Sequence, residues 1–256
     1  TITSAGEVRR AHLRHYSRTG RVDAHPDSTL VGLAISRDTD ASVFRDRTDA
    51  GTKLAAELTR YRDRRPVVLG LPRGGVAVAS PIAEGLSCPL DIIVVRKLGA
   101  PNRPELGVGA IAEHGVRVLN DELVAYLRVS DEHLALVEAR ERTELQRRVK
   151  QYRSQHPEVD LEARTAIIID DGLATGYTAR AAVLAARVRG AGEIVLAVPI
   201  GAEDTVADLT ELADRVIALS VPKDFRAVGF WYQDFTQTSD RQVLALLKAA
   251  RGNSVD

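Results

Sequence analysis

Two adjacent aspartates, Asp170 and Asp171, close a run of aliphatic residues and precede a turn with glycine and two threonines, in IIIDDGLATGYTAR (167–180). Helical spacing begins after that turn. The N–H groups at the start of a helix face any ligand there, and the helix dipole favours an anion. Paired carboxylates at the end of a parallel strand suit two vicinal hydroxyls. The pattern predicts a phosphate site formed by Ala174, Thr175, Gly176, Tyr177 and Thr178, with a hydroxyl-binding acid pair beside it.

A second strand, turn and helix are expected in VVLGLPRGGVAVAS (67–80). Gly74 and Gly75 allow the backbone to come close to a ligand and to present N–H groups to an anion. Pro72 and Arg73 precede them, and Arg73 adds a positive charge. A turn of this composition on its own is more often only a turn.

A third segment, VVRKLGAPNRPELGVGAI (94–111), begins on an apolar run and contains two prolines and three glycines after Lys97 that favour a long loop. Arg96, Lys97 and Arg103 could neutralise phosphate oxygens when such a loop closes and excludes water.

These motifs resemble those of the type I phosphoribosyltransferases, over residues 45–240 and in the order of that family. The resemblance implies that Asp170 and Asp171 bind the ribose hydroxyls of phosphoribosyl pyrophosphate (PRPP) and that residues 174–178 bind its 5′-phosphate. It implies a pyrophosphate loop at residues 72–75. Arg73, Arg96, Lys97 and Asp171 are the residues expected to act in catalysis, with Mg²⁺ held through PRPP and by the acid pair.

The family binds its acceptor base under a small hood, and this chain has five aromatic residues in VPKDFRAVGFWYQDF (221–235). Val221 and Phe225 are the candidates for contacts to the base. A structural cluster that ties the C-terminus to the sheet explains the aromatic residues equally well. Hypoxanthine-guanine members of the family have an acid just before the TG that exchanges a proton with the purine. This chain has Ala174 at that position, so the same proton transfer is not expected.

Apolar runs at 67–71, 90–95, 165–170, 193–198 and 215–219 alternate with helical segments, which predicts βαβ units on a parallel sheet. The predicted fold is α/β, a doubly wound, mainly parallel sheet with a small C-terminal hood and an inserted long helix. We expect a polar N-terminal arm at 1–43, a core at 44–220 with a helical insertion at 120–155, and a hood and tail at 221–256. Within the insertion, residues 130–155 have apolar residues at helical spacing.

Thirty-five basic and 35 acidic residues give a net charge of zero, so nothing in the overall charge favours nucleic acid or an anionic membrane. One cysteine, Cys88, excludes an internal disulfide framework and suits the cytoplasm. No apolar run reaches the roughly 20 residues of a membrane helix. The sequence has no Met, so we expect a removed initiator or a longer polypeptide, and the inserted helix favours a branch fused to a further catalytic domain.

Two functions remain open. The first is transfer of the phosphoribosyl group from PRPP to a nitrogenous base, with release of pyrophosphate, by a homodimer of the kind the family implies. The second is a regulatory module that binds PRPP without turnover. Intact binding groups are expected in both.

Overall fold

The computed structural model describes residues 32–35, 44–101, 103–154 and 156–252. The predicted N-terminal arm at 1–43 falls outside these residues except at Gly32–Ile35, which form a strand, β1. The sequence analysis assigned no strand there. β1 pairs in parallel with the edge of the central sheet.

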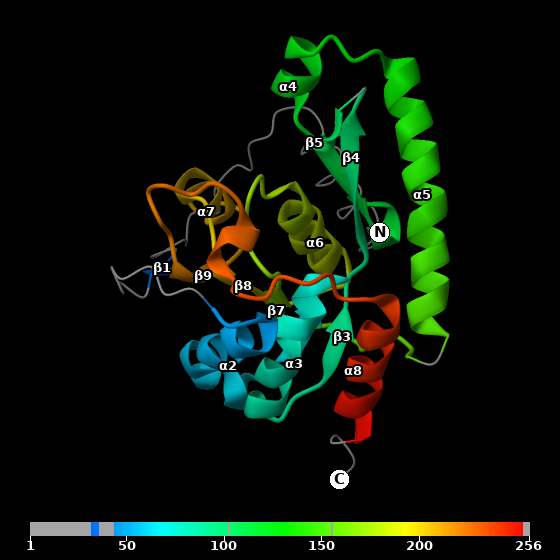
Figure 1. The fold of residues 1–256 in the computed structure, drawn as a ribbon. Helices are drawn as coiled ribbons and strands as arrows, with labels where there is room; N and C mark the ends of the chain where they lie inside the picture. Colours follow the sequence, from blue (N-terminus) through cyan, green and yellow to red (C-terminus); the bar gives the residue numbers. More distant parts are fainter. Residues whose placement is uncertain (1–31, 36–43, 102, 155, 253–256) are drawn as a thin grey trace, which may run out of the picture. The chain divides into compact units, whose positions relative to one another are not determined.

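The central sheet has six parallel strands in the order β1-β9-β8-β7-β2-β3 (Figure 1). The predicted α/β fold with a parallel sheet is therefore confirmed. Its middle strands are buried along their whole length because helices cover both faces, which explains their nearly continuous apolar sequences. The strands after β1 are β2 (Val67–Gly70), β3 (Leu90–Ile92), β7 (Thr165–Ile169), β8 (Glu193–Ile200) and β9 (Arg215–Ser220).

Helices cover the two faces of the sheet in two separate hydrophobic clusters. One cluster contains residues of α2 (Arg47–Leu58), α3 (Gly74–Leu86) and α8 (Asp240–Gly252), and α2 and α3 pack side by side (Figure 1). The other contains residues of α6 (Tyr177–Val188) and α7 (Glu203–Leu209). Short 3-10 helices, η1 (Thr59–Arg64) and η3 (Val228–Trp231), lie in the connections.

A second, antiparallel sheet replaces the loop predicted at residues 94–111. It consists of β4 (Val95–Ala100), β5 (Arg103–Ala112) and β6 (Arg117–Leu119), with irregular register around Gly99. A 3-10 turn, η2 (Glu113–Gly115), joins β5 to β6. The loop prediction was wrong because it weighed glycine and proline above Leu98, Val108 and Ile111, which are buried. Burial of these side chains in the hydrophobic cluster that contains α2, α3 and α8 outweighs the weak strand preference of their neighbours.

The inserted segment contains α4 (Asp121–Tyr126) and α5 (Asp131–Arg153), which confirms the predicted long helix. The side chains of Asn120 and Ser130 cap them by accepting hydrogen bonds from the backbone N–H groups of Leu123 and His133. α5 runs alongside the hairpin of β4 and β5, and its C-terminal end lies beside α8 (Figure 1). The apolar positions at helical spacing all lie in the first cluster or pack against it: Leu134, Val137, Leu145, Val149 and Tyr152.

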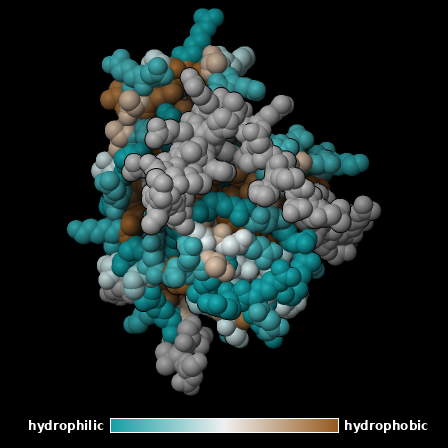
Figure 2. Space-filling view, turned by 180° about the vertical axis from the view of Figure 1, so that it is seen from behind, coloured by the Kyte–Doolittle hydropathy of each residue, from teal (hydrophilic) through white to brown (hydrophobic). Residues whose placement is uncertain are grey.

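From behind the view of Figure 1, the visible described surface is mostly hydrophilic (Figure 2). A hydrophobic area lies near the top of that view, at the end of the molecule that holds α4. Among the helices described, not one combines the length and the apolar character needed to cross a membrane.

Candidate functional site

The glycine turn packs directly against the acid pair. β2 and β7 are neighbouring parallel strands, so the turn after β2 and the two aspartates after β7 lie at the same edge of the sheet. A Cβ added to Gly74 would lie 1.9 Å from Asp171 Oδ2, and one added to Gly75 would lie 2.5 Å from the Ile169 carbonyl oxygen. The glycines were predicted to admit a ligand. In this structure glycine is also required at both positions, because any side chain would collide with Asp171 or with the Ile169 carbonyl oxygen.

The two carboxylates differ in their surroundings. Asp170 Oδ1 accepts a 2.9 Å hydrogen bond from the backbone N–H of Asp171. Desolvation, and then repulsion from the Asp171 carboxylate, raise the pKa of Asp170 well above its ordinary value. Asp171 has a cationic partner. Such a pair is ready to accept hydrogen bonds from hydroxyl groups or to bind a hard cation.

The partner of Asp171 is Arg47, a residue that the sequence analysis missed. Arg47 Nε donates a 2.8 Å hydrogen bond to Asp171 Oδ2, and both side chains are largely buried, at 11% and 19% exposure. Arg47 is the first residue of α2, just after the N-cap Asp46. No spacing signal connects it to an aspartate 124 positions away.

The C-terminal segment predicted to form a hood, 221–256, is joined to the same aspartate. The Tyr232 hydroxyl donates a 2.7 Å hydrogen bond to the Asp171 carbonyl oxygen, and its ring lies 5.0 Å from that of Phe235 and 5.4 Å from that of Phe44. The Arg47 guanidinium lies 4.0 Å from the centre of the Phe235 ring. The aromatic residues therefore form a structural cluster that also reaches the site.

The two predicted base contacts belong to different clusters. Phe225 packs beside the hood cluster of Phe44 and Tyr232, whereas Val221 packs against the cluster under α6 and α7. Phe230 is 69% exposed. The structure does not bring Val221 and Phe225 into one cluster.

The predicted phosphate turn ends at the N-terminus of α6. Gly176 has a φ of 74° and precedes the first helical residue, Tyr177. Among the described side chains none caps this helix, so the N–H groups of its first turn are left for a ligand or water. Ala174 and Thr175 are exposed, and the Thr205 hydroxyl donates to the Ala174 carbonyl oxygen at 2.6 Å. The turn is thus braced from α7 and open toward solvent.

Arg73 lies at the N-cap position of α3 and has no ion-pair partner among the described residues. The peptide bond from Pro72 to Arg73 is cis. Tyr152 of α5 is near Arg73: burial and the Asp240 carboxylate raise the pKa of that phenol, while the Arg73 charge acts in the opposite direction. Within the described part of the chain, Arg73 is therefore a free cation next to the glycine turn.

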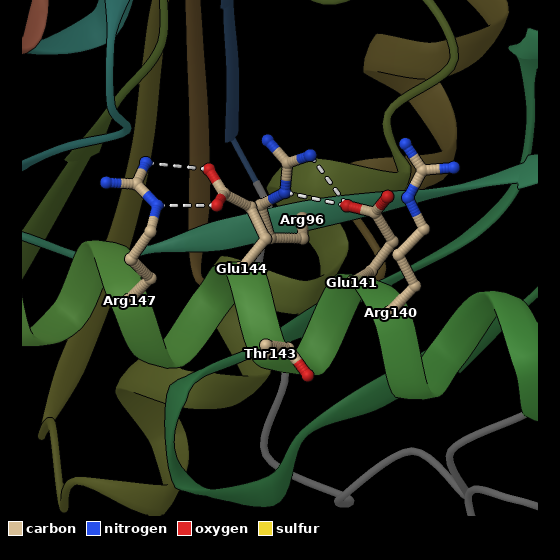
Figure 3. Close-up of a pocket in the computed structure, with 6 residues that line it drawn as sticks. All are labelled: Arg96, Arg140, Glu141, Thr143, Glu144 and Arg147. Atoms are coloured by element: carbon tan, nitrogen blue, oxygen red, sulfur yellow. Dashed lines mark hydrogen bonds and ion pairs between the residues drawn. The ribbon is translucent and has the colours of Figure 1, made fainter.

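Arg96 and Lys97 face other partners. Arg96 is paired with Glu141 of α5 (Figure 3), and both side chains line a pocket of about 570 Å³. Lys97 Nζ donates a 2.6 Å hydrogen bond to the Glu105 carbonyl oxygen. Glu141 and Tyr152 are eleven residues apart on α5, which corresponds to roughly 16 Å along a helix. Arg96 therefore lies beside Glu141, about three turns of α5 before Tyr152, which is the α5 residue that the Arg73 charge acts on.

A separate cluster of Glu113, His114 and Glu158 brings three potential ligand atoms within 4.8 Å of one another. His114 Nε2 lies 2.9 Å from Glu158 Oε1, and Glu113 Oε1 accepts the Val94 N–H at 2.7 Å. Arg153 and Arg189 also face Glu158, at 3.5 and 3.8 Å. Their positive charges disfavour a cation there, so the cluster is better described as an ion-pair network.

Residues 44–234 match the phosphoribosyl transferase domain family. The chain is 50% identical over 208 residues to a protein of Mycobacterium tuberculosis, in strains CDC 1551 and H37Rv, that is named provisionally as a phosphoribosyl transferase. The match covers 81% of this chain and 47% of the relative, so the chain spans about half the relative's length.

Among solved structures, the chain is similar to the protein TT1426 from Thermus thermophilus, with a TM-score of 0.67 and 42% sequence identity. That match covers 80% of this chain and 97% of the other. The family match extends from just before Arg47 to the hood and includes the glycine turn, the acid pair and the phosphate turn. The chain therefore belongs to the phosphoribosyl transferase family.

Proposed function

We propose that the protein transfers the 5-phosphoribosyl group of PRPP to the nitrogen of a base or related acceptor and releases pyrophosphate. One observation carries the proposal. The acid pair lies in contact with the glycine turn and is followed directly by the exposed phosphate turn. This arrangement supports sites for a pyrophosphate, two ribose hydroxyls and a 5′-phosphate at one edge of a parallel sheet, where such sheets bind ligands.

In this mechanism Asp170 and Asp171 hold the ribose hydroxyls, and residues 174–178 hold the 5′-phosphate by backbone N–H groups. The N–H groups of residues 72–75 and the Arg73 guanidinium bind the pyrophosphate. Displacement at C1 builds negative charge on the leaving pyrophosphate. Fixed N–H donors and Arg73 lower the barrier to the extent that they bind this charge more strongly in the transition state than they bind PRPP in the ground state. Arg96 and Lys97 would join this set when the hairpin of β4 and β5 moves over the site.

Mg²⁺ is the proposed cofactor, and the carboxylate oxygens of Asp170 and Asp171 fit it because Mg²⁺ prefers oxygen ligands. When bound with PRPP it would neutralise charge on the pyrophosphate. We also propose that the protein works as a homodimer in the cytoplasm and forms part of a longer polypeptide with a further catalytic domain.

A regulatory PRPP-binding module is the second candidate. It is favoured by one contact, the pairing of Arg96 with Glu141, which engages a predicted catalytic cation away from the glycine turn. Pyrophosphate release from Mg²⁺-PRPP, measured with a panel of purines, pyrimidines and related acceptors, tests the two functions. Release that depends on one acceptor supports the transferase. No pyrophosphate release with any acceptor, together with saturable PRPP binding, supports the regulatory module.

A further inference from the structure

Arg47 joins three parts of the candidate site, and the role inferred for it rests on the proposed function. Its Nε donates to Asp171 Oδ2 at 2.8 Å, and its Nη1 donates to the Thr236 carbonyl oxygen at 2.8 Å. The position of a Cβ on Gly74 would be 2.8 Å from Arg47 Nε. The guanidinium therefore lies among the acid pair, the hood and the glycine turn.

The hood is attached to the residues that precede Arg47. Phe44 forms a parallel bridge with Tyr232: the Phe44 N–H donates to the Trp231 carbonyl oxygen at 2.7 Å, and the Gln233 N–H donates to the Phe44 carbonyl oxygen at 2.8 Å. The Asp234 N–H donates to the Arg45 carbonyl oxygen at 2.8 Å. The start of α2 and the hood therefore form one unit, and Arg47 and the Tyr232 hydroxyl link that unit to Asp171.

The contacts of Arg47 require the shape of a guanidinium as well as its charge. Two hydrogen bonds leave it toward different segments, and its Cζ lies 4.0 Å from the centre of the Phe235 ring. An arginine can donate in fixed directions and stack on a ring at the same time, whereas a lysine ammonium is a single point charge on a flexible stem. An arginine that only neutralised Asp171 would need neither the Thr236 contact nor the ring.

We propose that Arg47 is a positioning residue for the phosphoribosyl transfer: it fixes the direction of the Asp171 carboxylate so that the free oxygen meets the ribose hydroxyls of PRPP. It acts through Asp171 and not by contact with the pyrophosphate. Because Arg47 Nε donates to Asp171 Oδ2, we assign the other carboxylate oxygen, Oδ1, to the ligand.

The test measures the affinity of the full chain for Mg²⁺-PRPP, ribose 5-phosphate and pyrophosphate by calorimetry. The variants are Arg47→Met, Arg47→Lys, Asp171→Asn and the double variant Arg47→Met/Asp171→Asn. Arg45→Gln is the matched control, because this neighbouring arginine is 76% exposed and pairs with Asp49 instead. Circular dichroism and thermal melting establish that each variant is folded.

We expect Arg47→Met to lower the affinity for PRPP and ribose 5-phosphate about tenfold, which is the scale of one lost charge-assisted contact. The affinity for pyrophosphate should fall by less than about twofold. Arg47→Lys should also lose most of the affinity, and Arg45→Gln should lose none. In the double variant, PRPP affinity should equal that of Asp171→Asn within about twofold, because two residues that act as a unit are not additive.

Three outcomes would each overturn the role proposed for Arg47 and leave the proposed function standing. They are an equal loss of pyrophosphate affinity in Arg47→Met, additive losses in the double variant, and unchanged PRPP binding by Arg47→Lys. If Arg47→Met does not fold, Arg47→Lys takes its place in the cycle. If neither folds, Arg47 is a structural residue and the proposal is wrong. Absence of PRPP binding by the wild type would instead contradict the proposed function, and the role of Arg47 would fall with it.

Discussion

Arg96 Nε donates a 2.8 Å hydrogen bond to Glu141 Oε2, and Arg96 Nη2 lies 2.6 Å from the same oxygen (Figure 3). The two side chains are 26% and 15% exposed, so the ion pair is largely shielded from water. β4 carries the arginine and the inserted helix α5 carries the glutamate. The insertion thus holds a residue that the proposed reaction would use on the pyrophosphate.

Glu141→Gln should release Arg96 for the ligand. We expect the affinity for Mg²⁺-pyrophosphate to rise about two- to threefold, while the free energy of unfolding falls by about 0.5–1 kcal/mol as the ion pair is lost. Calorimetry and urea unfolding measure the two effects. Glu138→Gln is the control, because Glu138 lies one turn earlier on α5 and holds Arg117 of β6 at 2.7 Å. Equal changes in pyrophosphate affinity for both variants would show that Arg96 is not the residue released.

Gly74→Ala should damage both the fold and the site. The added Cβ would lie 1.9 Å from Asp171 Oδ2 and 2.8 Å from Arg47 Nε, so the loop or the ion pair must move. We expect a loss of about 1–3 kcal/mol in the free energy of unfolding, together with weaker PRPP binding. Gly85→Ala, in the same helix, meets only Ala55 Cβ at 3.7 Å and should be neutral or stabilising by up to roughly 1 kcal/mol. A stable Gly74→Ala protein that binds PRPP normally would contradict the contact.

His114→Asn should lower stability in a pH-dependent way. The hydrogen bond to Glu158 raises the pKa of His114, and the same bond lowers the pKa of Glu158 to about 2. The stability that His114 contributes is complete below its ordinary pKa of 6.5 and is lost as the pH rises through the folded value. Glu158 contributes above its ordinary pKa of 4.5 and loses that contribution as the pH falls toward 2.

The destabilisation by His114→Asn should therefore be greatest near pH 5–6 and smaller at pH 9. About a third of each side chain is exposed, so solvent limits the effect to about 0.5 kcal/mol. Asparagine is the chosen replacement because His114 has a φ of 59°, a conformation that asparagine tolerates. Urea unfolding at several pH values measures the difference. A difference that does not change with pH would show that the ion pair does not contribute.

The parts of the site that are contiguous in the sequence could be predicted. The acid pair, the glycine turn and the phosphate turn each lie at a strand-to-helix junction, and parallel strands bring those junctions to one edge. Arg47 could not be predicted, because its partner is distant in the sequence and only the folded chain brings the first residue of α2 to Asp171, just after β7. The hairpin of β4 and β5 could not be predicted from its glycines and prolines, because burial against α5 and α6 decides its structure.

The most direct test of the account is a thermal-shift titration with Mg²⁺ and PRPP, with ribose 5-phosphate and Mg²⁺ alone as comparisons. At a PRPP concentration about 100 times Kd, binding to one site should stabilise the fold by about 2.7 kcal/mol and raise the melting temperature by roughly 5–10 °C. The account predicts a saturable shift that is larger with PRPP than with ribose 5-phosphate and is much smaller in Asp171→Asn. No shift at millimolar PRPP, or the same shift in Asp171→Asn, would contradict it.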